Sequence, residues 1–237
     1  MQPRQAIFNV PGAVLAALGV MGAVHMLRSV LPSDDELLLT LALAFIPARY
    51  GDMEGTLPGG ELAGVTSFAT YMFVHGDLTH LLVNAMWMLA FGSAIAKRVG
   101  NLRFLLFSLL CGIAGALVHL VLHWGEAVPV VGASAAISGQ MAGAVRFLFA
   151  GPKSFGASPE VLRTIPLAGI GATLSNPRMI VFLAVWAGVN LIFGLGYLQF
   201  GTGGASIAWE AHIGGFVAGL LGIGLFDRRP AATPDPH

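Results

Sequence analysis

The feature that most constrains this chain is a succession of apolar stretches long enough to cross a lipid bilayer. A helix needs about 17–25 mostly apolar residues to span the hydrocarbon core. Six stretches meet or approach that length: Pro11–Val30, Thr79–Ala96, Leu102–Leu122, Ser134–Ala150, Met179–Leu198 and Ser206–Phe226. Only 10% of the 237 residues are charged, against about 25% in an ordinary soluble domain. The sequence therefore predicts an all-α, polytopic membrane protein with six transmembrane helices.

The connections between these stretches leave no room for a separate soluble domain. Residues 1–229 are expected to form a single membrane domain, and residues 230–237 a disordered tail. The longest connection, Leu31–Leu78, contains a shorter apolar run, Leu37–Ala48. A run of that length is too short to span, so we expect it to lie against the membrane surface.

Lysine and arginine are concentrated in alternate connections, which predicts an orientation. Ten of the twelve basic residues precede the first span, follow the sixth, or lie in or next to the connections after the second and fourth. Basic residues favour cytoplasmic loops, so both termini are predicted to be cytoplasmic. The short loops suit a bacterial inner membrane. The net charge is zero and gives no sign of nucleic-acid binding.

Four polar residues fall in the outer half of the membrane under this topology. His80 and Asn84 open the second span, Ser134 opens the fourth, and His212 lies a short way into the sixth. All three spans enter from the outer side, so their polar residues lie at similar depth. Polar side chains inside a membrane are costly and are read by default as functional.

These residue types are the parts of a serine hydrolase. Ser134 needs a base to take its proton, and His212 is the histidine within the last span. Glu210 lies on another face of the helix, which favours a Ser-His dyad. Backbone amides at a helix start are unpaired, so Gly132 and Ala133 are expected to help bind an oxyanion.

Small residues follow both proposed catalytic residues at helical spacing. Gly139 and Gly143 lie below Ser134, and Gly215 and Gly219 lie below His212. Such pairs allow close helix packing in membranes, so the fourth and sixth spans are predicted to pack along them.

Three motifs, in this order, resemble those of the rhomboid family of intramembrane serine proteases. They are His80-Leu81-Leu82-Val83-Asn84, Gly132-Ala133-Ser134 and Ala211-His212-Ile213-Gly214-Gly215. The resemblance extends over nearly the whole chain and implies a rhomboid-like six-helix bundle. It implies Ser134 as nucleophile, His212 as general base, and His80 with Asn84 as oxyanion donors. It also implies cleavage of transmembrane protein substrates near the outer face of the bilayer, without metal or cofactor.

Two positions depart from the family pattern. Ala135 stands where the family usually has glycine, and its methyl group is expected to crowd the oxyanion site while leaving the backbone N–H in place. Ser138 stands where the family often has an aromatic that stacks on the histidine. His212 must therefore be oriented by other groups or by the Ser138 hydroxyl.

Two other functional classes fit the sequence less well. A catalytically inactive rhomboid-like protein that binds membrane clients is favoured only by Ala135. A transporter predicts ionisable residues at the midplane or inverted repeats, and neither is found. His119 and His123 have metal-ligand spacing, but no third ligand lies at suitable spacing, so no metal is predicted. Ser158, in a second Gly-Ala-Ser sequence on the opposite side, is given no catalytic role. The sequence indicates no oligomeric state.

Overall fold

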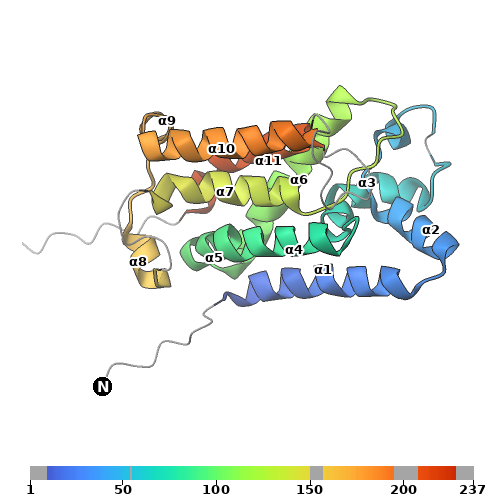
Figure 1. Ribbon diagram of the computed structural model, residues 1–237, viewed down its shortest axis with the longest axis horizontal. Coiled ribbons are helices and arrows are strands. Elements are labelled where there is room, and N and C mark those ends of the chain that lie inside the picture. Colours follow the sequence, from blue (N-terminus) through green and yellow to red (C-terminus); the bar gives the residue numbers. More distant parts are fainter. Residues whose placement is uncertain (1–9, 54, 150–156, 195–207, 228–237) are drawn as a thin grey trace, which may run out of the picture.

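The computed structural model describes residues 10–53, 55–149, 157–194 and 208–227, and most residues in these ranges are helical (Figure 1). The predicted tail, residues 230–237, lies outside them. The long helices are α1 (Gly12–Val30), α4 (Leu78–Trp87), α5 (Ser93–Val99), α6 (Asn101–Leu122), α7 (Ser134–Leu148), α10 (Pro177–Gly194) and α11 (Trp209–Phe226). A π-helical turn, η3 (Met88–Gly92), joins α4 to α5.

The prediction of a polytopic helical membrane protein is confirmed. Within the described residues four helical segments are long and apolar enough to cross a membrane: α1, the continuous run Leu78–Val99, α6 and α11. The shorter helices α7 and α10 lie at the fourth and fifth predicted spans. The count of six spans and the side of the termini stay predictions.

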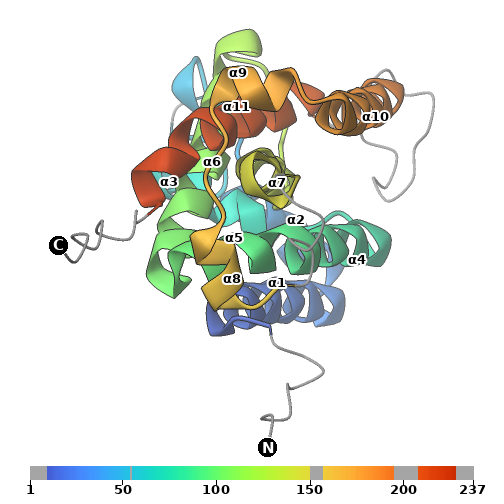
Figure 2. The same cartoon turned by 90° about the vertical axis from the view of Figure 1, so that its left-hand side faces the viewer.

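Helix α7 lies at the centre of the molecule. Figure 2 shows it end-on, with α6 and α11 to one side, α4 and α5 to the other, and α10 at the periphery. Every residue from Ala135 to Leu148 is buried. A helix that is covered all round needs small residues where its neighbours approach.

Glycines provide that close approach between α7 and α11. A methyl group on Gly215 would collide with the backbone of Ala135, and one on Gly219 would collide with the backbone of Gly139. The predicted packing of the fourth span against the sixth is therefore confirmed. Gly143 lies between both neighbours, since a methyl group on it would lie 3.0 Å from the Phe107 ring on α6 and 3.3 Å from the Ile223 Cβ on α11.

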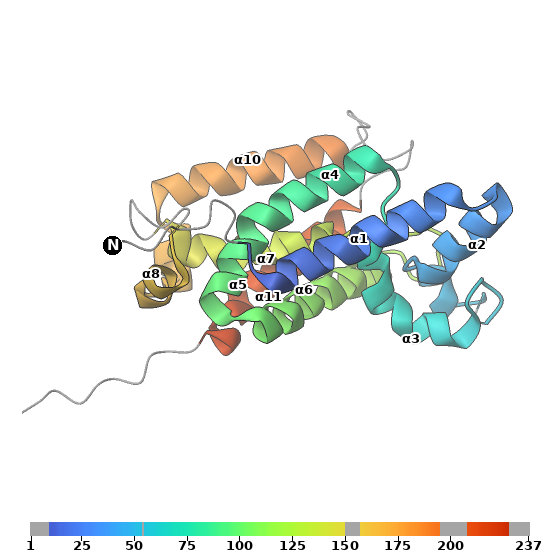
Figure 3. The ribbon, with the colours of Figure 1, turned by 90° about the horizontal axis from the view of Figure 1, so that it is seen from below.

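The long first connection is largely helical. It forms α2 (Ser33–Leu43), η1 (Pro47–Tyr50), α3 (Gly60–Thr70) and η2 (Tyr71–Phe73). Figure 3 shows α2 and α3 gathered beyond one end of the long helices. The apolar run Leu37–Ala48 was predicted as one surface segment, but its helix ends at Leu43. The backbone of Phe45 then pairs with that of Val130, just before α7, through hydrogen bonds of 3.1 and 2.8 Å.

Buried arginines hold the opposite end of the bundle, near α8 (Pro159–Thr164) and α9 (Ile170–Leu174). Arg98 donates to both carboxylate oxygens of Asp227 at 3.0 and 2.8 Å, and to the carbonyl of Leu162 at 2.7 Å. Arg146 donates to the carbonyl of Leu220 at 2.9 Å. Each guanidinium thus ties the end of α11 to an earlier part of the chain.

Candidate active site

The starts of α4, α7 and α11 lie at the same end of the bundle, beside α2 and α3 (Figure 1). Each of these starts carries a polar residue that the sequence predicted for the site: His80, Ser134 and His212 respectively. Three segments that are distant in the chain therefore bring their polar groups to one layer.

Ser134 and His212 are hydrogen-bonded to each other. The Ser134 Oγ lies 2.7 Å from the His212 Nε2. Both side chains are half-buried. The glycine packing of α7 on α11 brings the two helix backbones close enough for this bond to form. This is the geometry in which a histidine can take the proton of a serine hydroxyl.

The other nitrogen of His212 bonds to a residue that the sequence analysis missed. The His212 Nδ1 lies within hydrogen-bonding distance of the Asn190 Oδ1, on α10. The Asn190 Nδ2 donates to the Trp186 carbonyl at 2.8 Å, which fixes the orientation of the amide. An amide oxygen can only accept, so His212 carries its proton on Nδ1. Its Nε2 is then free to accept the Ser134 proton.

Asn190 could have been found from the sequence by the criterion that identified the others. It is a polar residue within an apolar span, and such residues are read as functional. Its pairing with His212 was not visible because no motif or fixed spacing links the two. The structure thus orients His212 through Asn190, whereas Ser138 was one expected source of that orientation.

His80 faces Gly132 with the ring nitrogen that carries its proton. The His80 Nδ1 accepts a hydrogen bond of 3.4 Å from the Gly76 backbone N–H, which leaves the proton on Nε2. The Asp77 carboxylate caps the start of α4 by accepting from the His80 backbone N–H at 2.8 Å. A methyl group on Gly132 would lie 2.7 Å from the His80 Nε2 and 3.8 Å from the Ser134 Oγ. The His80 Nε2–H and the Ser134 hydroxyl therefore both border the space beside Gly132.

Gly132 serves the site differently from the prediction. Its backbone N–H donates to the Tyr71 carbonyl at 2.9 Å, so this amide is not free to bind an oxyanion. Its φ of 113° is a conformation that favours glycine, and the missing side chain makes room for the His80 ring. Ala133 is buried directly before α7, whose first amides have no partner within the helix. Asn84 is buried and donates to the His80 carbonyl at 2.9 Å.

The methyl group of Ala135 lies away from the position where crowding was expected. A methyl group built on Gly115 of α6 would lie 2.6 Å from the Ala135 Cβ, so the alanine side chain points into the space that this glycine leaves. Ala135 and Gly115 are complementary in the packing of α7 against α6. The one departure that favoured an inactive protein therefore has a packing explanation.

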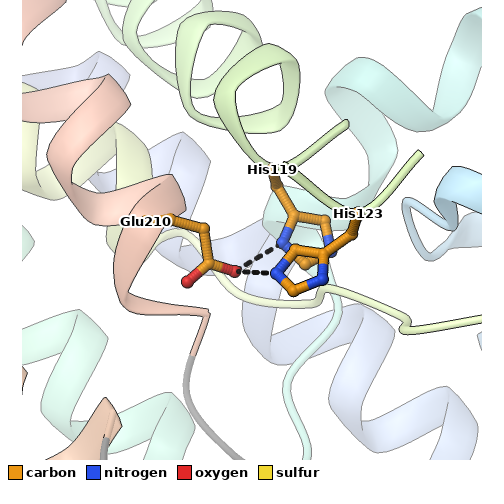
Figure 4. A group of neighbouring side chains, drawn as sticks. All are labelled: His119, His123 and Glu210. Carbon is orange, nitrogen blue, oxygen red and sulfur yellow. Dashed lines mark hydrogen bonds and ion pairs between the residues drawn. The ribbon is translucent and has the colours of Figure 1, made fainter. Parts of the chain in front are cut away.

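Two further residues bear on the predictions. Ser158 caps α8, at the opposite end of the bundle, by accepting from the Val161 N–H at 3.5 Å. Glu210 reaches His119 on α6 and His123 directly after it (Figure 4). The expectation that these histidines have no third ligand was wrong, because a neighbouring helix supplies it.

The group that converges here comprises a hydroxyl, a neutral imidazole, an amide that orients the imidazole, and a second imidazole N–H. Such a group can perform nucleophilic acyl transfer. Among known families, the model described as a Rhomboid domain matches residues 63–228. A search of curated proteins finds no match.

Proposed function

Since the chain belongs to the rhomboid family of intramembrane proteases and inactive relatives, we propose that it is an active intramembrane serine endopeptidase. Its substrates are transmembrane proteins, cleaved near the outer face of the membrane. The observation that carries the proposal is the 2.7 Å hydrogen bond between Ser134 and His212. Asn190 supports it, because it holds the imidazole in the tautomer that a base requires.

The reaction proceeds in two steps through an ester on Ser134. The Ser134 Oγ attacks the scissile carbonyl carbon while the His212 Nε2 takes the hydroxyl proton. The tetrahedral oxyanion accepts hydrogen bonds from the His80 Nε2–H and from backbone amides at the start of α7. As the C–N bond breaks, His212 gives its proton to the leaving amine. Water then attacks the ester with His212 as base, releasing the carboxylic acid and restoring Ser134.

A substrate helix has to unwind before this attack. Peptide bonds inside a helix are shielded by their own hydrogen bonds, and unwinding is easiest at glycine or proline. Preferred substrates therefore carry small or helix-destabilising residues near the outer membrane boundary. Each donor that stabilises the oxyanion contributes about 2.7–4 kcal/mol to transition-state stabilisation.

Labelling by a fluorescent fluorophosphonate tests the proposal, because this reagent reacts with activated serines. The folded parent protein and Ser158→Ala should be labelled, whereas Ser134→Ala and His212→Ala should not. Ser158→Ala is the matched control, since Ser158 also follows a Gly-Ala pair. The same four proteins are then assayed for cleavage of a transmembrane substrate reconstituted with them. Cleavage by Ser134→Ala at the parental rate would refute the proposal.

An unlabelled parent that is well folded would support the alternative, an inactive relative that binds membrane clients.

The orientation of the protein in the membrane is tested separately, in a chain whose Cys111 is first replaced by alanine. Ala127→Cys lies at the end of the bundle that holds the site, and Glu160→Cys at the opposite end. A membrane-impermeant maleimide added outside intact bacteria should label only the former if the termini are cytoplasmic. The reverse labelling would place the site on the cytoplasmic side.

A further inference from the structure

A second cluster of ionisable side chains lies beside the catalytic layer and takes no part in the proposed reaction. His119 and His123 project from the end of α6 toward Glu210, at the start of α11 (Figure 4). The Glu210 Oε1 lies 2.6 Å from the His119 Nδ1 and 3.3 Å from the His123 Nε2. One ligand atom from each residue lies within 4.8 Å of the other two.

The remaining nitrogen of each imidazole also faces an oxygen. The His119 Nε2 lies 3.2 Å from the Val128 carbonyl, and the His123 Nδ1 lies 2.8 Å from a Glu126 carboxylate oxygen. A neutral imidazole has one N–H and therefore satisfies only one of its two oxygen neighbours. If the outer nitrogens donate to Val128 and Glu126, the inner ones direct lone pairs toward the lone pairs of Glu210. A cation between these three groups removes that repulsion.

This outer arrangement is the one that orients histidines at metal sites. Metal-ligating histidines donate their other ring N–H to a carboxylate or to a backbone carbonyl, which fixes the tautomer and the ring orientation. Here Glu126 supplies the carboxylate and Val128 the carbonyl. Both ring orientations are thus set by the folded chain before any ion binds.

We propose that His119, His123 and Glu210 form a binding site for a divalent transition-metal ion, with Zn²⁺ as the natural occupant. Two imidazoles and a carboxylate suit zinc, whereas magnesium and calcium prefer oxygen ligands. Adjacent ligands of a tetrahedral zinc ion lie about 3.3 Å apart. The His123–Glu210 distance matches this spacing, and the His119–Glu210 pair has to open by several tenths of an ångström.

The ion would position α11 and would take no part in the hydrolysis itself. It would join the end of α6 to the start of α11, two residues before His212. His119 is fully buried, but the His123 side chain is 31% exposed, so the site is open to solvent on one side. Zinc binding would hold the first turn of α11 in place and with it the base.

Zinc binding to the detergent-solubilised full chain tests this directly. The protein is purified through a tag without histidine, dialysed against ZnCl₂, and analysed for zinc by atomic emission. The parent and Ser134→Ala should each bind one equivalent, which separates this proposal from the proposed protease activity. His123→Ala and Glu210→Gln should lose at least about 10-fold in zinc affinity, and Glu126→Gln about 10-fold through the outer contact. MgCl₂ in excess should not compete.

Glu61→Gln is the matched control for Glu210→Gln, because Glu61 is an exposed carboxylate on α3. It should bind zinc like the parent. His123→Ala protects the test against misfolding, since this side chain is partly exposed and its loss leaves the core of α6 intact. Zinc should also raise the melting temperature of the parent by several degrees and leave that of His123→Ala unchanged. Substoichiometric zinc in the parent, or equal affinity in His123→Ala, would overturn the proposal.

Discussion

Gly215→Ala should separate α11 from α7 and disconnect the serine from its base. The added methyl group would lie 2.7 Å from the carbonyl carbon of Ala135 and closer still to its oxygen, whereas ordinary contact begins at 3.4 Å. Backbone atoms cannot rotate aside, so the two helices have to move apart by on the order of 1 Å. Ser134 directly precedes Ala135, so its 2.7 Å bond to His212 would stretch beyond hydrogen-bonding distance.

The size of the expected losses in stability and cleavage rate follows from these displacements. Overpacking costs about 1–3 kcal/mol, and alanine in a helix returns up to about 1 kcal/mol relative to glycine. A misplacement of about 1 Å costs on the order of 100-fold in rate. We therefore expect Gly215→Ala to lower the melting temperature by a few degrees and to reduce substrate cleavage in proteoliposomes by about 100-fold.

Gly224→Ala is the control on the same helix. A methyl group there meets only the Leu167 Cδ2, at 3.8 Å, which is an ordinary contact. It makes the same change in helix propensity without touching α7, so it should keep its activity and melt at or slightly above the parental temperature. If Gly215→Ala cleaves substrate and melts like Gly224→Ala, the glycine contact does not position the site and the reasoning fails.

Three further predictions concern the contacts around the site and at the ends of the bundle. Asn190→Ala should lower kcat by about 10-fold or more at unchanged KM. Asn190→Asp should have a kcat between those of Asn190→Ala and the parent, because a carboxylate also accepts a hydrogen bond from the histidine. Equal kcat in the two variants would exclude a positioning role for Asn190. Arg98→Ala should lower the free energy of thermal unfolding by about 3–5 kcal/mol, because it leaves the partly buried carboxylate of Asp227 without its partner. A loss below about 1 kcal/mol would contradict this. Burial raises the pKa of Glu36, but the hydrogen bonds from Arg28 and Thr40, together with the charge of Arg28, leave it below its ordinary value of 4.5. The stabilisation from this pair is therefore present above pH 4.5 and lost as the pH falls through the lowered pKa, so thermal unfolding of Glu36→Gln should lack that acid-sensitive component.

Features that depend on one segment at a time were predictable from the sequence. Apolar length located the long helices, and the starts of three of them carried His80, Ser134 and His212. Because alternate spans enter from the same side, their polar residues had to lie in one layer. The glycine spacing on α11 then predicted which helix α7 packs against.

The specific side-chain and backbone contacts between segments were not predictable from spacing. Asn190 reaches His212 from another helix, and Glu210 completes a group whose other members are on α6. Helical periodicity indicated that Glu210 and His212 lie on different faces of one helix, but not which residues Glu210 contacts. The same holds for Phe45, whose backbone leaves the helix to pair with Val130.

The shortness of α7 has a consequence for how the protein is made. Its 15 residues extend over roughly 22 Å, less than the hydrocarbon core of about 30 Å, and they include Gln140 and Arg146. A nascent segment of this kind is a poor candidate to enter a bilayer alone and needs neighbouring helices to accept it. Its main cover, α11, is synthesised after all the other described helices. A chain truncated before Trp209 would therefore lack both its base and the covering of α7, and would be an exposed target for membrane quality control.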